Sequence, residues 1–197
     1  MKTVLLTSQE NITLNPDDNT QYVLIPTDNV DLEITMEERG VEVNLLVVYA
    51  LHGKDKITLN TKSVHTVPNT SCNVEIKAAL FDSSKSSYEG QILITKDAQQ
   101  TKSFLRDDVL LFGNGVSNVC KPVLEISAND VKASHGATSG QINEEQLYYL
   151  MSRGLTKKEA LNIILKGFFE SLLTKIEDEK IREKVTSELF KEINVQI

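Results

Sequence analysis

Residues 132–142 read KASHGATSGQI, and the character of the sequence changes across this stretch. Before it, short runs rich in Val, Ile, Leu and Thr alternate with polar residues, which is typical of β-strands. After it, apolar residues recur every three or four positions, which is typical of amphipathic helices. The stretch therefore divides the chain into a β-rich domain at residues 1–140 and a helical domain at residues 141–197.

Composition excludes several classes of protein. The 197 residues are 40% hydrophobic and 25% charged, as expected for a soluble globular chain of one sizeable domain, alone or with an appendage. A net charge of −7 argues against nucleic-acid binding, because phosphate contacts need clustered Lys and Arg. No apolar run is long enough for a membrane span or a signal peptide. Cys72 and Cys120 form no disulfide framework, so we expect reduced thiols in a cytoplasmic protein.

The β-rich domain holds no 3.6-residue period long enough for a helix. Two of its runs, at residues 12–15 and 57–60, both read ITLN. Recurring strands without intervening helices are compatible with a β-solenoid, a sandwich or a barrel, and periodicity leaves sandwich and solenoid equally open. The runs are TVLLT, NITLN, YVLIP, DLEITM, VEVNLLVVYAL, KITLN, SVHTV, NVEIKAALF, QILIT, VLLFG and VLEIS.

Capping signals predict three helices in the helical domain. Asn143 is a favoured N-cap and Gly154 a favoured C′ residue, so the first helix lies between them. Thr156 and Glu159 form a capping box for a second helix, and a third is expected at about residues 178–192. The predicted apolar stripes are Ala160, Ile163, Ile164, Gly167, Phe168 and Leu172 on the second helix, and Ile181, Val185, Leu189 and Phe190 on the third.

His135 is the main candidate for chemistry because its neighbours are small. Gly136 and Gly140 permit close approach of another chain or ligand, and the lack of bulk leaves the imidazole accessible. Strand alternation places His135 on the same face as Val131 and Ala133. A metal ligand, a general base and a structural core residue all remain open, since a single His without ligand-spaced Cys or His is most often structural.

Other motifs give little support for enzyme chemistry. The chain contains no Walker loop, GxGxxG, CxxC or GxSxG motif, which argues against nucleotide binding, a self-contained zinc site and a serine hydrolase. Glu144 and Glu145 are explained as partners of a helix dipole. Asp107 and Asp108 are expected in a solvated turn. A β-helix polysaccharide lyase or hydrolase is a remote alternative, because no cluster of acids or bases is apparent on one solenoid face.

Two blocks of motifs, in order along the chain, resemble a known family. The first block contains HTVPNT at residues 65–70, Lys77, Ser86 and GQI at 90–92. The second contains LEI at 124–126, DVK at 130–132, SHGAT at 134–138 and GQINEEQLYYLMSRGL at 140–155. Over about residues 60–175, the chain resembles the SufB/SufD family of iron–sulfur cluster assembly proteins.

The resemblance implies a mainly β fold, a parallel β-helix followed by a small C-terminal α-helical domain, and so favours the solenoid. It implies a non-enzymatic scaffold subunit that pairs through its β-helix with a SufB-like paralogue or with a second copy. It also implies a transient iron–sulfur cluster, with no tightly bound cofactor, and a SufC-like ATPase docked on the helices. The expected partner-binding residues are Tyr148, Leu150, Met151, Arg153, Gly154, Leu155 and Phe168.

The site residues follow from the same resemblance. The SHGAT form is similar to the SufD version of the motif, which implies His135 as an iron ligand. Val116 lies near the position of the SufB cysteine, and Cys120 is displaced from it, so Cys120 is a candidate substitute ligand. Ala133 replaces a common Cys before Ser134, and the long N-terminal region usual in the family is missing. These departures leave open a minimal protein that only tethers the ATPase.

Overall fold

The computed structural model describes residues 1–194, which form eleven β-strands followed by three α-helices. The strands are β1 (Lys2–Leu6), β2 (Asn11–Leu14), β3 (Thr20–Leu24), β4 (Val30–Met36), β5 (Glu42–Leu51), β6 (Lys56–His65), β7 (Ser71–Phe81), β8 (Lys85–Ile94), β9 (Thr101–Phe112), β10 (Ser117–Ile126) and β11 (Val131–Gln141). The helices are α1 (Glu144–Ser152), α2 (Lys157–Leu173) and α3 (Glu179–Asn194).

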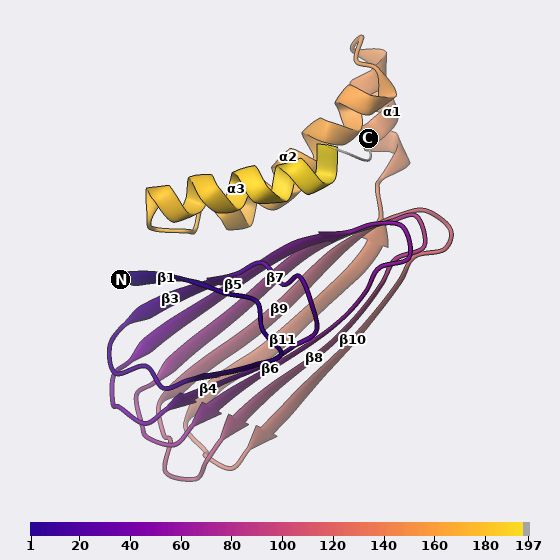
Figure 1. Ribbon diagram of the computed structural model, residues 1–197. Coiled ribbons are helices and arrows are strands. Elements are labelled where there is room, and N and C mark those ends of the chain that lie inside the picture. Colours follow the sequence, from indigo (N-terminus) through magenta and orange to yellow (C-terminus); the bar gives the residue numbers. More distant parts are fainter. Residues whose placement is uncertain (195–197) are drawn as a thin grey trace.

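The strands wind into a parallel β-helix (Figure 1). The odd-numbered strands form a six-stranded sheet in the order β1-β3-β5-β7-β9-β11, called the odd sheet below. The even-numbered strands form a five-stranded sheet in the order β10-β8-β6-β4-β2, the even sheet. Each strand pairs in parallel with the strand two positions further along the chain. The solenoid is confirmed, and the antiparallel sandwich is excluded.

Stacked apolar side chains fill the space between the two sheets. Leu45 on β5 is in register with Val74 on β7, and Val74 is in register with Leu105 on β9. All three are buried in one continuous core. Because parallel in-register strands repeat every turn, each inward position builds a column of side chains through the β-helix. Burial of each large aliphatic side chain contributes roughly 1.5–3 kcal/mol.

Several strands are longer than their apolar runs predicted. β9 begins at Thr101, although the predicted run begins at Val109, and β8 begins at Lys85, although its run begins at Gln91. Hydroxyl side chains occupy inward positions in these added segments, so hydropathy does not reveal the strands. The buried Ser and Thr residues of these two strands are Ser86, Thr101 and Ser103.

Buried hydroxyl groups inside the β-helix pair with one another. Tyr88 Oη lies 2.6 Å from Thr61 Oγ1, and Tyr49 Oη lies 2.7 Å from Ser86 Oγ. A Cβ at Gly90 would overlap the Tyr88 hydroxyl, so glycine at this position makes room for the tyrosine. These pairs satisfy polar atoms that would otherwise be costly to bury.

The predicted helix signals are confirmed. The Asn143 side chain accepts hydrogen bonds from the backbone N–H groups of the second and third residues of α1. Gly154 has a φ of 97°, the left-handed conformation expected after a helix end. Thr156 and Glu159 form both hydrogen bonds of the capping box at the start of α2. The third helix, predicted at about residues 178–192, is α3.

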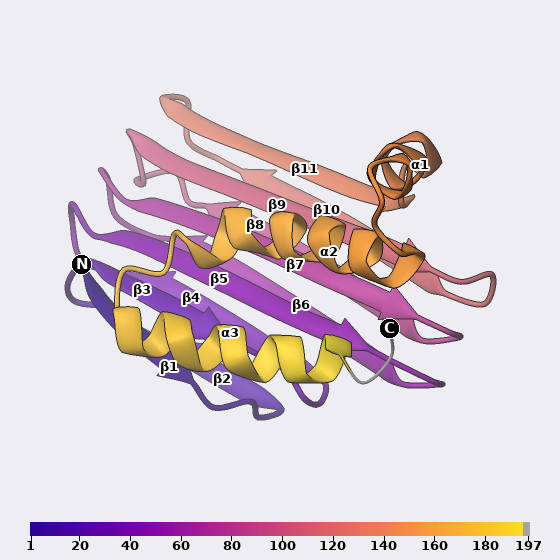
Figure 2. The ribbon, with the colours of Figure 1, turned by 90° about the horizontal axis from the view of Figure 1, so that it is seen from above.

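Helices α2 and α3 lie across the outer face of the odd sheet (Figure 2). A second apolar core forms between them, and this explains why β5 and β7 carry nearly continuous apolar runs rather than strict alternation. Lys77 Nζ also donates to the Phe168 carbonyl at 2.8 Å, and Gln21 Nε2 donates to the Lys175 carbonyl at 2.8 Å. The buried residues of this core are Val23, Leu46, Val48, Ala79, Phe81, Leu165, Phe169, Leu172, Leu173, Ile176, Val185, Leu189 and Ile193.

The buried stripe of α2 matches the predicted stripe only in part, since Ala160 and Leu172 are fully buried as predicted. Leu165 and Phe169 are fully buried, whereas Ile163 is 49% exposed. Much of the predicted stripe faces α1 instead, because α1 folds back along α2 and offers a second apolar neighbour. A groove separates α1 from α2 here, and the predicted residues that line it are Ile163, Ile164, Gly167 and Phe168. On α3, Val185 and Leu189 are buried as predicted.

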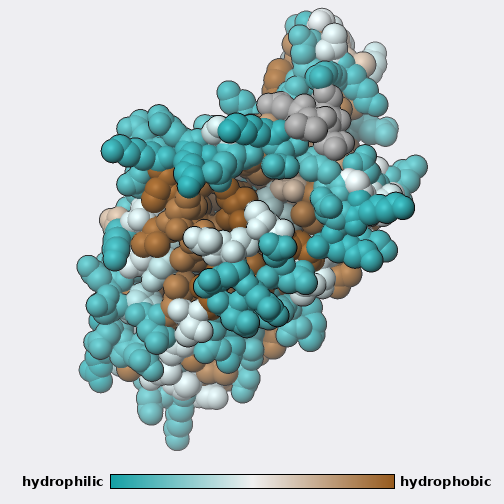
Figure 3. Space-filling model, viewed as in Figure 1, coloured by the Kyte–Doolittle hydropathy of each residue, from teal (hydrophilic) through white to brown (hydrophobic). Residues whose placement is uncertain are grey.

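The two ends of the β-helix differ in chemistry. At the end formed by β1 and β2, apolar side chains gather below α3 and are framed by polar ones (Figure 3). Val4, Leu6 and Leu14 pack there against the core. At the other end, β11 carries the run of small and polar residues around His135. This second end is the one where the candidate site residues lie.

Candidate functional site

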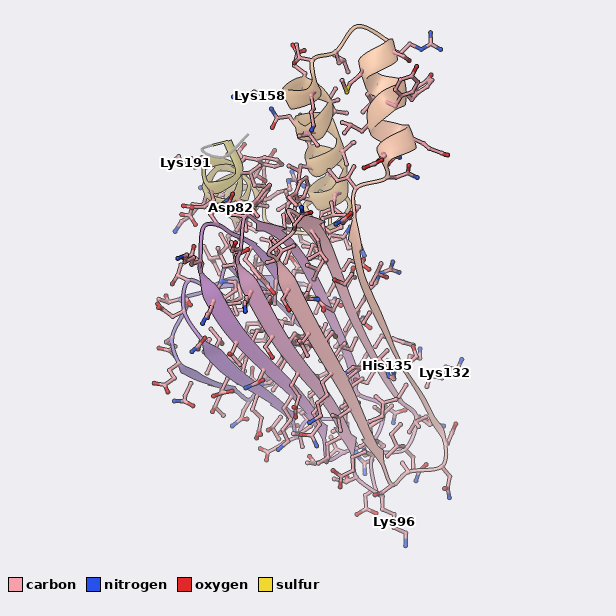
Figure 4. The ribbon with its side chains drawn as sticks, turned by 90° about the vertical axis from the view of Figure 1, so that its right-hand side faces the viewer. Asp82, Lys96, Lys132, His135, Lys158 and Lys191 are labelled. Atoms are coloured by element: carbon pink, nitrogen blue, oxygen red, sulfur yellow. The ribbon has the colours of Figure 1, made fainter. Side chains whose placement is uncertain are left out.

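His135 lies on β11, the last strand of the odd sheet, in the half of the strand remote from α1 (Figure 4). It is in register with Leu105 on β9, which is buried in the core, so His135 is on the inward face of the sheet. No strand of residues 1–194 extends the odd sheet beyond β11, and His135 is exposed. A nitrogen donor therefore lies at the open end of the β-helix.

Small residues around His135 keep this end uncovered. A Cβ added at Gly136 or Gly140 would meet no atom within 4 Å among the described residues. Ala137 and Thr138 are also exposed. Packing within the described part of the chain therefore does not require this run of small side chains. The run leaves space in which another chain or a ligand can approach the imidazole.

Cys120 lies on β10, the last strand of the even sheet. It is in register with the buried Tyr88, so the thiol faces inward, and it is half-buried against the core. Burial raises the pKa of the thiol to about 12, and the nearby Asp107 charge acts in the same direction. Within residues 1–194, no three His, Cys, Asp or Glu side chains are grouped as a metal site. Iron binding by His135 and Cys120 therefore stays a prediction.

Asp107 is a candidate that the sequence analysis missed. The predicted solvated turn at Asp107 and Asp108 is wrong, since both residues lie within β9. Asp107 faces inward and is only 1% exposed, and burial raises the pKa of its carboxyl to about 6. The signal that could have found it is strand alternation, which places it between Leu105 and Val109 on the inward face.

Asn118 and Cys120, both inward-facing on β10, lie next to the Asp107 carboxylate. Both act to lower the pKa of the carboxyl, although neither meets the distance and angle of a hydrogen bond to it. Among the described residues, both carboxylate oxygens of Asp107 and the Oδ1 atom of Asn118 are buried without a hydrogen-bond partner. Such atoms are rare in folded proteins, because burying an acceptor without a donor is unfavourable.

The other two histidines have packing roles. His65 is fully buried, its Nδ1 lies 2.7 Å from Thr70 Oγ1, and burial lowers the pKa of its imidazole to about 4. His52 stacks on Phe81 with ring centroids 4.7 Å apart, and burial lowers its pKa as well. Neither lies at the open end of the β-helix.

The predicted partner-binding residues lie on α1, on α2 and in the connection between them, and they include both exposed and half-buried side chains. Tyr148 is 75% exposed and Met151 is 41% exposed. Arg153 donates from Nη2 to the Tyr149 hydroxyl at 3.2 Å. The half-buried Leu155 follows Gly154 in the connection between the helices.

Neither α1, α2 nor α3, as described to residue 194, is long and apolar enough to cross a membrane.

A groove of about 540 Å³ lies between α1 and α2. Two predicted partner-binding residues, Leu150 and Phe168, line it. The Lys77 ammonium group lies 4.3 Å from the centre of the Phe168 ring and fixes that side of the groove to the odd sheet. The groove is lined by Leu110, Gln146, Tyr149, Leu150, Ile163, Ile164, Gly167 and Phe168.

Residues 27–168 match a protein family described as the SUF system FeS cluster assembly, SufBD core domain. The match extends from the early turns of the β-helix to the middle of α2. The chain belongs to the SufBD family. The family resemblance inferred from the SHGAT and HTVPNT motifs is confirmed.

Relatives of known name agree with the family. The chain is 34% identical over 113 residues to the iron–sulfur cluster assembly protein SufD of Escherichia coli, covering 57% of the chain and 27% of that protein. It is 32% identical over 133 residues to SufB of Bacillus subtilis, covering 67% of the chain and 28% of SufB. A SufBD family protein of Mycobacterium tuberculosis is 36% identical over 111 residues, 56% of the chain and 13% of that protein. The matched regions are thus less than a third of each relative.

Proposed function

We propose that this SufBD-family chain is a non-catalytic scaffold subunit of SUF iron–sulfur cluster assembly. The observation that carries the proposal is the position of His135, an exposed nitrogen donor on the inward face of the last strand. In this position, a second protein that covers the open end of the β-helix would also cover the imidazole. Iron is the substrate of this assembly rather than a resident cofactor of the chain.

The open end of the β-helix is the surface proposed for pairing. Edge strands such as β10 and β11 present unpaired backbone groups that can bond to another chain. Inward-facing apolar side chains on β10 add to this surface, since Leu124 is 37% and Ile126 39% exposed. The partner is a SufB-like protein or a second copy of this chain. The similarity to both a SufB and a SufD supports pairing within the family.

In the proposed assembly, His135 offers a neutral imidazole nitrogen to iron. Imidazole suits iron as a ligand, while clusters are usually held by soft thiolates. Cys120 is the candidate thiolate of this chain, and the partner or inorganic sulfide supplies the other sulfur ligands. The chain itself transfers no electrons and hydrolyses nothing.

A SufC-like ATPase is proposed to dock on α1 and α2. The exposed Tyr148 and Met151 and the apolar groove between the helices are the support for this assignment. Because α2 is packed on the odd sheet, movement of the ATPase would reach the β-helix through this contact. ATP is hydrolysed by the partner. This chain supplies the docking surface and transmits the movement through α2 to the β-helix.

Iron retention tests the role of His135. His135→Ala should lower the iron content of the complex assembled and purified without oxygen, with an unchanged circular dichroism spectrum. Lys132→Ala is the matched control, because Lys132 lies on the opposite face of the same strand and pairs with the exposed Lys102 (Figure 4). Equal iron in the His135→Ala complex and the wild-type complex would remove the ligand assignment.

Co-purification tests the ATPase assignment. The folded chain should retain a SufC-like ATPase, and the double variant Tyr148→Ala/Met151→Ala should lose it. Lys158→Ala, an exposed change on α2, is the control and should bind normally. Failure of the folded wild-type chain to bind would count against docking.

A second function is a tether that carries the ATPase but no cluster. It is favoured by Ala133, which places a methyl group where a thiol is common in the family motif. Anaerobic reconstitution of the paired complex with iron and sulfide separates the two functions. A brown, absorbing complex supports the scaffold, and a colourless complex supports the tether.

A further inference from the structure

Three oxygen atoms without hydrogen-bond donors are buried in the last turns of the β-helix. Within residues 1–194 these are Oδ1 and Oδ2 of Asp107 and Oδ1 of Asn118. Asp107 lies on β9 of the odd sheet, and the neighbouring Asn118 and Cys120 lie on β10 of the even sheet. The three side chains therefore face each other across the interior.

The missing partner of these oxygens has the properties of a cation. The cation adjacent to Asp107 on β9, Arg106, points outward, where its Nε donates to Asp108 at 2.8 Å. The buried hydroxyls of Tyr49 and Tyr88 are already paired with Ser86 and Thr61. A carboxylate that is buried without a donor or a charge partner is stabilised by a bound metal ion.

We propose that Asp107, Asn118 and Cys120 bind one divalent first-row transition metal ion inside the last turns of the β-helix. Carboxylate and amide oxygens alone would suit Mg²⁺ or Ca²⁺, and the thiolate shifts the preference towards Fe²⁺, Co²⁺ or Zn²⁺. Asn118 contributes Oδ1, the atom that lacks a hydrogen-bond partner. Solvent supplies the remaining ligands.

The ion enters the proposed site from the open end of the β-helix. Asp107 is in register with Ala137 on β11, an exposed residue whose side chain is only a methyl group. His135 is the next inward residue on the same strand, so a metal ion that enters past Ala137 passes close to the imidazole. The assignment of the ion as iron rests on the proposed function.

Binding exchanges a proton for a metal–sulfur bond. The Sγ–H bond of Cys120 breaks as the Sγ–metal bond forms, and the proton leaves to solvent. The metal ion stays divalent, and nothing is oxidised or reduced.

Cobalt binding tests the site directly. Co²⁺ added to the full metal-free chain should give a sulfur-to-cobalt charge-transfer absorption at one ion per chain and should raise the Tm. Asp107→Asn and Cys120→Ser should each weaken Co²⁺ binding about tenfold or more. Cys72→Ser should retain the full absorption, because Cys72 lies deep in the core next to Ser63. Asn118→Ala provides a second oxygen-removing variant should Asp107→Asn fail to fold.

The outcomes separate this site from the proposed function. His135→Ala should leave Co²⁺ affinity within about twofold of wild type even where it lowers iron in the assembled complex. Absorption that survives Asp107→Asn and Asn118→Ala, that disappears in His135→Ala alone, or that never develops would overturn the internal site. Failure of the chain to pair or to bind the ATPase would overturn the proposed function and leave the cobalt result standing.

Discussion

The middle and the last turns of the β-helix use the same strand pattern with opposite results. On β5, the inward residues Val43, Leu45 and Val47 are sealed between neighbouring strands and the even sheet, with no measurable exposure. On β11, the inward residues Ala133 and His135 face an end that no later strand of residues 1–194 covers. Alternation that builds a core in one turn therefore builds an accessible surface in the other.

The comparison separates residues that stabilise the fold from residues that face a partner. A column of aliphatic side chains holds the middle turns together. A cavity made by shortening one of these side chains would not be filled by solvent. The last turns lack that column and carry small residues, a thiol, an amide, a carboxylate and an imidazole. The exposed groups among them have no partner within the described residues, which is the position expected of residues that bind another molecule.

The largest expected effect is in the middle turns. Leu45→Ala should lower the free energy of unfolding by roughly 2–5 kcal/mol, because it leaves a cavity in a closed core. Urea denaturation followed by circular dichroism measures the change. A loss below about 1 kcal/mol would show that the middle turns are not sealed.

Acid should destabilise the closed core through His65. Burial lowers the pKa of its imidazole from 6.5 to about 4, so the folded chain favours the neutral form. Its contribution is therefore intact above pH 6.5 and is lost as the pH falls towards 4, by roughly 3 kcal/mol in all. Urea midpoints between pH 8 and pH 4 measure this loss in the Asp107→Asn background, because the raised pKa of Asp107, about 6, acts with the opposite sign in the same pH range. In that background, His65→Gln should flatten the profile, and a profile that keeps its slope would contradict the assignment to His65.

Asp107→Asn should stabilise the metal-free chain, although it changes a buried residue. It replaces a buried carboxylate without partners by a neutral amide of the same shape, and we expect a gain of about 1–3 kcal/mol at pH 8. The measurement is urea denaturation in the presence of a chelator. Destabilisation by Asp107→Asn would mean that the carboxylate has a structural partner and belongs with the sealed turns.

The smallest expected effect is at the open end. Leu124→Ala on β10 should change the stability of the single chain by less than about 1 kcal/mol, because the side chain is already 37% exposed. The same change should weaken pairing with a SufB-like partner or a second copy, as measured by sedimentation. A large loss of stability without loss of pairing would reverse the assignment of the two regions.

The helical region was predictable because its signals are local. Asn143, Gly154, Thr156 and Glu159 specify helix ends within a few residues of sequence, and all of them have the expected roles. The choice of buried face on α2 was predictable only in part, since Ala160 and Leu172 were expected there and Leu165 and Phe169 were not. That choice depends on two competing apolar neighbours, α1 and the odd sheet, which are distant in sequence.

The solenoid and its site were predictable only in part. Periodicity could not separate solenoid from sandwich, because strand alternation is the same in both and the pairing partners are far apart; the SHGAT and HTVPNT motifs decided it. His135 stood out through its small neighbours. Asp107 did not, because a charged pair with Asp108 is typical of a turn, and its burial depends on β7, β10 and β11 lying around it.

Hydrogen exchange on β11 tests the central claim most directly. In the complex with a SufB-like partner, or in the dimer of this chain, the amides of Val131–Gln141 should exchange more slowly than in the isolated chain, because the edge strand gains a neighbour. The amides of β5, already paired on both sides, should not change. Unchanged exchange on β11 in a complex that is shown to be assembled would contradict the account.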